Sequence, residues 1–240
     1  RPRDWSSDVC SSDLHTGGNA AISKAGESIS GNNTDGTALL GAGAVSSASI
    51  FATENTWRRM AETNSSDHTM IDAQPTEPFL GERYELFNGE PIQVYSQPGA
   101  NTDATGIVFF RRSDVISAGD AFSFDTYPLI DRKRGGSIQG VLAALNRMLD
   151  LAVPKDKQEG GTYIIPGHGR VCDEADVVEY RDMVTIIRDR IADAIKRGLN
   201  LEQVKAAQLT MDYDGRFGTT SGSWTTDMFV EAVYRDLGGK

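Results

Sequence analysis

The sequence has 240 residues, enough to bury a sizeable core, and one domain is the default at this length. Its net charge of −10 argues against a nucleic-acid partner and against an anionic membrane surface, because both would require a basic patch. No apolar run is long enough to cross a bilayer, so membrane insertion is not expected. Two cysteines, Cys10 and Cys172, are too few for a disulfide framework, and the compartment, bacterial periplasm or cytoplasm, stays open.

The first fourteen residues, RPRDWSSDVCSSDL, show neither helical nor strand periodicity, and no initiator Met precedes them. They resemble a translated sequencing-adapter read. We therefore expect residues 1–14 to be a non-native segment and residues 15–240 to be an incomplete domain whose native start lies further upstream.

The next stretch opens with His15-Thr16-Gly17-Gly18-Asn19, in which the glycines permit a tight turn and Asn19 can cap a helix over residues 20–25. Residues 48–53 favour a strand and residues 54–62 a short helix. Residues 63–78 are rich in Asn, Ser, Asp and Pro and predict a long loop. His68 lies inside that loop, and we expect it to be solvated.

A β-rich region follows. Two strands at residues 84–87 and 92–95 flank Asn88-Gly89, which is typical of a type I′ hairpin turn. Two more strands are predicted at residues 107–110 and 115–116, with a turn between them. The second runs into Ser117-Ala118-Gly119-Asp120, which places the Asp120 carboxylate at the end of a strand.

Helical signals dominate the remainder, apart from one strand. Ser137 caps an apolar stripe that runs to Leu149, and a long helix with acidic residues in its first turn ends at Gly198. Asn200 with Gln203 predicts a capping box, and Thr225 or Thr226 caps a last helix. Residues 212–215 resemble the start of a calcium loop but lack its later ligands, so a turn is predicted in a Gly- and Thr-rich loop. Strands and helices in alternation indicate the α/β class.

The exceptional strand, residues 162–165, carries the clearest chemical signal. We expect Pro166 to end it, because proline has no N–H for the ladder. His168 follows between Gly167 and Gly169, at a strand's carboxyl end, where α/β sheets place their chemistry. Cys172, just beyond, is predicted to be a buried small hydrophobic residue.

His15, Asp120 and His168 each lie beside glycines at a predicted turn or strand end. Neutral imidazoles with a carboxylate suit zinc or another first-row metal. The residues themselves leave an alternative open, in which His15 caps a turn, Asp120 ends a strand and His168 fills a pocket.

Four short elements occur in the order of the metallo-β-lactamase superfamily motifs: His15-Thr16-Gly17-Gly18-Asn19, Asn101-Thr102-Asp103, Ser117-Ala118-Gly119-Asp120 and Pro166-Gly167-His168-Gly169. The chain resembles that superfamily, in its glyoxalase II-like branches, from about residue 14 to residue 240. The resemblance implies an αββα sandwich that here lacks its first strands, with zinc at one edge of the sheets.

The resemblance also implies ligands, position by position. His15 matches the last histidine of the family's HxHxDH element, Asp120 the aspartate between the two metals, and His168 the final histidine. The HxH pair is absent, Leu14 replaces the aspartate, and a further histidine ligand is replaced by Asn101. One or two zinc ions are therefore implied for an intact protein, with weak or no binding here. Asn101, Thr102 and Asp103 are candidates for supporting the ligands through hydrogen bonds, although an Asx turn is the favoured explanation of Asp103.

The function implied by the resemblance is a metal-dependent hydrolase that uses metal-bound hydroxide on an ester, thioester, amide or lactam-like bond. Asp120 and His168 would carry the catalysis on a small-molecule substrate, and the truncated chain would be impaired. The alternative, motivated by Asn101, is a non-catalytic binding member of the same fold. Neither the substrate nor the oligomeric state can be predicted from the sequence.

Overall fold

The computed structural model describes residues 17–25, 48–63 and 73–239. The predicted non-native segment and the residues His15, His68 and Cys10 lie outside these ranges. The chain divides into two compact units, residues 1–81 and residues 82–240, and we describe each by itself. No described helix has both the length and the apolar character that a membrane span requires.

The described residues of the first unit form two helices and a small parallel sheet. The helix α2 (Asn19–Ala25) begins at Asn19, one residue earlier than predicted, and the Asn19 side-chain amide donates to the carbonyl of Ala73 at 3.4 Å. Strand β1 (Phe51–Thr53) leads directly into α3 (Glu54–Thr63), as the sequence predicts. Strand β2 (Glu77–Phe79) pairs with β1 in parallel, although these residues were predicted to be loop.

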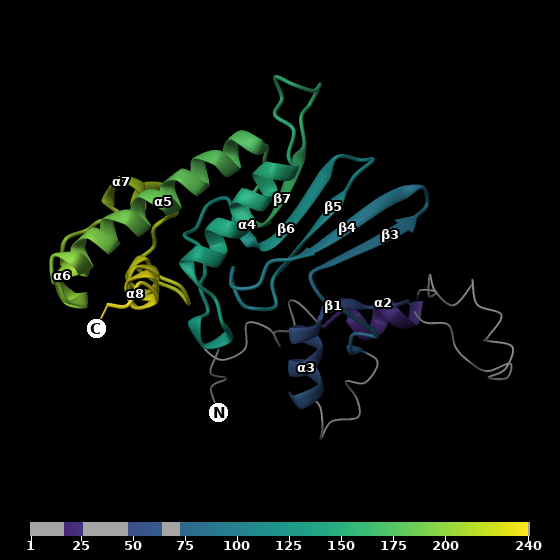
Figure 1. Cartoon of the computed structure of the whole chain (residues 1–240), viewed down its shortest axis with the longest axis horizontal. Coiled ribbons are helices and arrows are strands. Elements are labelled where there is room, and N and C mark those ends of the chain that lie inside the picture. Colours follow the sequence, from purple (N-terminus) through teal and green to yellow (C-terminus); the bar gives the residue numbers. More distant parts are fainter. Residues whose placement is uncertain (1–16, 26–47, 64–72, 240) are drawn as a thin grey trace, which may run out of the picture. The chain divides into compact units, whose positions relative to one another are not determined.

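The second unit is built on a five-stranded sheet of order β3-β4-β5-β6-β7 (Figure 1). Its strands are β3 (Glu82–Phe87), β4 (Glu90–Ser96), β5 (Gly106–Phe110), β6 (Val115–Ser123) and β7 (Tyr163–His168). The β3–β4 hairpin turns at Asn88 (φ 52°) and Gly89 (φ 73°), which confirms the type I′ prediction. All pairs are antiparallel except β6 with β7, which are parallel.

All five strands are longer than predicted, and two of the extensions reach the predicted site residues. Strand β6 continues to Ser123, so Asp120 does not end it, and β7 passes through Pro166 to His168, so Pro166 does not end that strand. Because β7 is at the edge of the sheet, a proline that lacks an N–H can be tolerated there without breaking a ladder on both sides.

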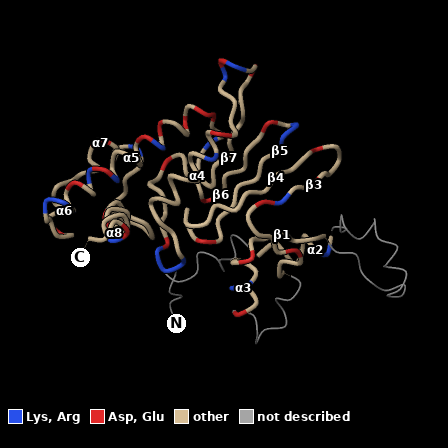
Figure 2. The backbone as a smooth tube through the Cα atoms, in the orientation of Figure 1, with Lys and Arg blue, Asp and Glu red and all other residues tan. Residues whose placement is uncertain are grey.

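Helices cover one face of the sheet (Figure 1). A short 3₁₀ helix η3 (Arg132–Arg134) precedes α4 (Ile138–Leu151), which is capped by Ser137 as predicted. The long helix α5 (Glu174–Lys196), along which acidic and basic residues alternate (Figure 2), packs against α4. The hydrophobic core joins the inner residues of the strands, such as Ile107, Ile116 and Ile164, to both helices.

Three helices complete the unit: α6 (Leu201–Ala206), α7 (Met211–Phe217) and α8 (Thr226–Asp236). The Asn200–Gln203 capping box and the Thr225 cap confirm the predictions for α6 and α8. Helix α7 corrects the predicted turn at residues 212–215. It forms because Phe217 is buried against Tyr127 and Tyr180, while the Tyr127 hydroxyl donates to Asp214 at 2.8 Å.

Candidate metal centre at one edge of the sheet

The strand topology brings several of the predicted site residues to the same end of the strands of the five-stranded sheet. Strand β4 ends and β5 begins at the end where the parallel strands β6 and β7 have their carboxyl ends. The β4–β5 connection, residues 97–105, therefore lies at the same end of the sheet as Asp120 and His168. Strands β5 and β6 are in ordinary van der Waals contact there: a Cβ on Gly119 would lie 3.9 Å from the carbonyl oxygen of Gly106.

Asp120 lies at an irregularity in β6. The register of β6 with β7 shifts on both sides of Gly119, whose φ of +50° suits glycine. Beyond this bulge the Asp120 carboxylate lies close to Gly167. A Cβ placed on Gly167 would lie 2.8 Å from Asp120 Oδ1 and 2.8 Å from the carbonyl oxygen of Gly119. The glycine before His168 is thus required by the close approach of the aspartate.

His168 is the last residue of β7, and its side chain is exposed. It pairs in register with Ser123, and its carbonyl oxygen accepts a hydrogen bond of 3.0 Å from the Phe124 N–H. Gly169 follows with φ +107°, and a Cβ there would lie only 2.6 Å from the Cβ of Phe124. The glycines on both sides of His168 therefore allow the backbone around this residue to lie close to β6.

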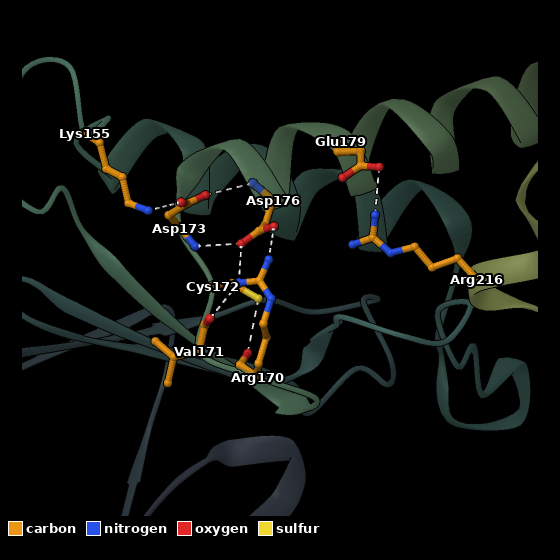
Figure 3. Close-up of polar contacts among 8 residues, drawn as sticks. All are labelled: Lys155, Arg170, Val171, Cys172, Asp173, Asp176, Glu179 and Arg216. Atoms are coloured by element: carbon orange, nitrogen blue, oxygen red, sulfur yellow. Dashed lines mark hydrogen bonds and ion pairs between the residues drawn. The ribbon is translucent and has the colours of Figure 1, made fainter.

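A polar cluster holds the segment after His168 to the start of α5 (Figure 3). Arg170 binds Asp176 through both guanidinium nitrogens, at 2.9 Å and 2.7 Å. Asp176 also forms a reciprocal capping box with Asp173, the N-cap of α5, and Lys155 reaches Asp173 at 2.5 Å. The hydrogen bond from Lys155 lowers the pKa of the Asp173 carboxyl below its ordinary value. The cluster was not predicted, although the acidic first turn of α5 was.

Cys172 is 2% exposed, as predicted, and lies beside this cluster. Its thiol donates to the carbonyl of Arg170 at 3.2 Å, and burial raises the pKa of the thiol to about 11. A thiol with that pKa is neutral at pH 7, so it is a poor nucleophile and a poor metal ligand.

Two arginines contact the ring of Phe124, an arrangement that was not predicted from the sequence. The guanidinium carbons of Arg170 and Arg216 lie 4.2 Å and 4.5 Å from the centroid of its ring. Arg216 projects from α7 and binds Glu179 of α5 at 2.8 Å (Figure 3). Phe124, whose N–H donates to the carbonyl of His168, is therefore contacted by one arginine from the segment after β7 and one from α7.

Asn101, Thr102 and Asp103 occupy the β4–β5 connection. Asn101 is 4% exposed, and its side-chain amide donates to the carbonyl of Leu129 at 3.2 Å. Thr102 is also buried, and its hydroxyl accepts from the N–H of Ala104 at 3.1 Å. Asp103 donates its own N–H to the carbonyl of Arg134 at 2.8 Å. These bonds fix the connection, and a supporting role towards metal ligands stays a prediction.

The described residues fit a metal ion only in part. Asp120 and His168 supply a carboxylate and an imidazole on neighbouring strands, which is donor chemistry that suits zinc. No group of three or more His, Cys, Asp or Glu side chains that could hold a metal occurs among residues 17–25, 48–63 and 73–239. The remaining predicted ligand, His15, lies outside these ranges.

Comparison with known proteins supports the fold. No family model and no curated protein matches the chain. A solved structure of a stereoselective inverting sec-alkylsulfatase from Pseudomonas sp. is similar, with a TM-score of 0.55 and 12% identity over 80% of this chain and 37% of that one. A metallo-β-lactamase from Pontibacter korlensis has a TM-score of 0.43 and 15% identity over 57% of this chain and 58% of that one. The chain thus spans less than two thirds of either protein, and the likeness to the sulfatase extends to fold alone.

Proposed function

We propose that this chain, which has the fold of the metallo-β-lactamase superfamily, is a metal-dependent hydrolase in which Asp120 and His168 bind the metal. The observation that supports the proposal best is the close approach of Asp120 Oδ1 to Gly167, the residue before His168: that oxygen lies 2.8 Å from the position that a Cβ on Gly167 would occupy. The residue that the resemblance adds to this pair is His15. The substrate would be a small molecule with an ester, thioester, amide or lactam-like bond.

Each side chain has a definable role in this proposal. A bound zinc ion supplies a Lewis acid and lowers the pKa of a coordinated water towards roughly 7. The Asp120 carboxylate provides negative charge for a cation, and His168 provides a neutral nitrogen donor. The bidentate Arg170–Asp176 pair ties the segment just after His168 to α5, which helps to position the backbone that carries the imidazole.

Metal binding by the full chain tests the ligand assignment. Cobalt(II) would be titrated while its visible absorption is recorded, and zinc content would be measured after dialysis. We expect Asp120→Asn and His168→Gln each to weaken binding by at least about tenfold. His68→Gln and Asp182→Asn are the matched controls, since neither position belongs to the proposed site. Equal metal affinity in all five proteins would remove the assignment.

Turnover is tested separately on a panel of esters, thioesters, amides and lactams, with and without added zinc. Zinc-dependent hydrolysis that is lost in Asp120→Asn supports a hydrolase. Metal binding without turnover of any class supports the second candidate, a non-catalytic binding member of the same fold.

One observation favours this second candidate. The position where the resemblance expects a histidine ligand holds Asn101, which is buried and donates to a backbone carbonyl. An impaired enzyme should gain bound metal and turnover on Asn101→His. A non-catalytic protein should gain no turnover from the same substitution, and circular dichroism would confirm that the variant is folded.

A further inference from the structure

The two edges of the five-stranded sheet differ in how they are protected. At the β7 edge, Ile164 exchanges two backbone hydrogen bonds of 2.8 Å with Cys172, and Pro166 interrupts the row of donors. The other edge is β3, to the right in Figure 1, whose described neighbour in the sheet is β4 alone. Tyr84 and Leu86 on β3 are 60% and 69% exposed, so two large side chains lie uncovered on one face of this edge strand.

The turn of the hairpin determines which backbone groups of β3 face outwards. A two-residue turn closes with a hydrogen-bonded pair, here Phe87 with Glu90. Since antiparallel strands alternate between bonded and non-bonded pairs, Phe87, Glu85 and Arg83 direct their N–H and C=O groups to β4. Glu82, Tyr84 and Leu86 therefore direct theirs to the open edge.

We propose that β3 pairs antiparallel with β3 of a second copy of this chain, with Tyr84 opposite Tyr84, so that the two sheets become one. In this register the outward-facing residues of each copy, Glu82, Tyr84 and Leu86, all find hydrogen-bonding partners. The exposed side chains of Tyr84 and Leu86 lie on one face of the strand. In the dimer they pack against the side chains on the same face of β3 in the other copy. The inference is independent of the proposed hydrolase function.

Charge selects this register from its alternatives. The outward N–H and C=O groups of the two β3 strands face each other only if the register is the one with Tyr84 opposite Tyr84 or differs from it by an even number of residues. With Tyr84 at the centre, Arg83 lies opposite Glu85 of the other copy, twice by symmetry. A shift of two residues in one direction puts Arg83 opposite Arg83, and a shift in the other direction puts Glu85 opposite Glu85. Within one copy the side chains of Arg83 and Glu85 share a face of the strand and form an ion pair of 2.6 Å.

Sedimentation equilibrium of the full chain over a range of concentrations tests the pairing. We expect reversible dimers, and Tyr84→Pro should abolish them because proline removes an outward N–H while leaving the bonds to β4 in place. Arg83→Glu and Glu85→Arg should each raise the dissociation constant at least about tenfold by placing like charges opposite each other. Arg197→Glu, at an exposed ion pair with Asp193 on α5, is the matched control and should leave the constant unchanged.

Mixing the two charge variants gives the sharper result. Each variant has like charges at positions 83 and 85 of its own strand, so opposite charges can meet only between copies. We expect an equimolar mixture of Arg83→Glu and Glu85→Arg to form heterodimers at concentrations where either alone is monomeric. A wild-type chain that stays monomeric, dimers insensitive to these substitutions, or a mixture that stays monomeric would each overturn the proposal. If Tyr84→Pro fails to fold, the mixture decides.

Discussion

At the scale of single residues, the glycines of the PGHG element have different neighbours and therefore different reasons to be glycine. Gly167 has no positive φ, and what excludes a side chain there is the close approach of Asp120 and Gly119. Gly169 has both a positive φ and a close neighbour, Phe124. A sequence pattern can mark both positions, but only the packing separates them.

Gly167→Ala should destabilise the protein by about 1–3 kcal/mol, because the added methyl group would lie 2.8 Å from Asp120 Oδ1 and must displace the carboxylate or the strand. Urea unfolding followed by circular dichroism measures the loss. The control is Gly215→Ala within α7, where a Cβ meets nothing within 4 Å and the change should be neutral or stabilising by up to about 1 kcal/mol. Equal effects at the two positions would contradict the argument.

The charge of Asp173 should appear in the pH dependence of stability. Its pKa is lowered in the folded protein, first by the hydrogen bond from Lys155, so ionised Asp173 favours the folded state. That contribution is complete above the unfolded value of about 3.9 and is lost as the pH falls through the lower folded pKa. Asp173→Asn keeps a capping side chain but cannot titrate, so its stability should decline less steeply below about pH 4. Parallel unfolding profiles for the two proteins would refute this.

At the scale of elements, local signals were predicted well and non-local ones poorly. The Asn88-Gly89 turn and the caps at Ser137, Asn200 and Thr225 depend only on residues close in the sequence, and the structure confirms all four. Strand β2 and helix α7 were missed because they depend on partners far along the chain, β1 for the strand and Tyr127 for the helix. The extension of β7 through Pro166 was missed for the same reason.

The candidate site shows the same division. The sequence predicted that Asp120 and His168 both end strands; the structure confirms this for His168, whereas β6 continues past Asp120 to Ser123. The two residues still lie on neighbouring strands because β6 and β7 pair in parallel. The sequence could not predict the Arg170–Asp176 pair or the two arginines on Phe124, since these contacts join α5 to the segment after β7 and α7 to the residue after β6. Residue type indicates the chemistry, whereas the supporting contacts depend on tertiary packing.

The cap of α4 gives a test at this scale. Ser137 Oγ accepts from the Gly140 N–H at 2.9 Å and donates to the carbonyl of Gly99 at 3.1 Å, tying the helix to the β4–β5 connection. Ser137→Ala should cost about 1–2 kcal/mol in thermal or urea unfolding. Thr225→Ala at α8, where the capping bond is 3.3 Å and exposed, should cost less. The reverse order would show that the connection to Gly99 adds nothing.

At the scale of the whole molecule, the distribution of the core is uneven between the two units. Among the described residues, every member of the main hydrophobic cluster, from Tyr95 to Tyr234, belongs to residues 82–240. That unit also contains the complete five-stranded sheet and the helices that cover one of its faces. A unit that buries its own core and pairs its own strands has what independent folding requires.

A polypeptide of residues 82–240 should therefore fold by itself. We expect it to unfold cooperatively in urea, with an m-value in proportion to its size, and to show the helical circular dichroism of α4, α5 and α8. Its core variant Ile187→Ala, at a side chain that is fully buried in α5, should lose about 2–5 kcal/mol both in this polypeptide and in the full chain. The exposed variant Ile186→Ala, one position away, should lose much less in both. Non-cooperative unfolding of the shorter polypeptide, or a loss at Ile187 seen only in the full chain, would show that residues 1–81 complete the core.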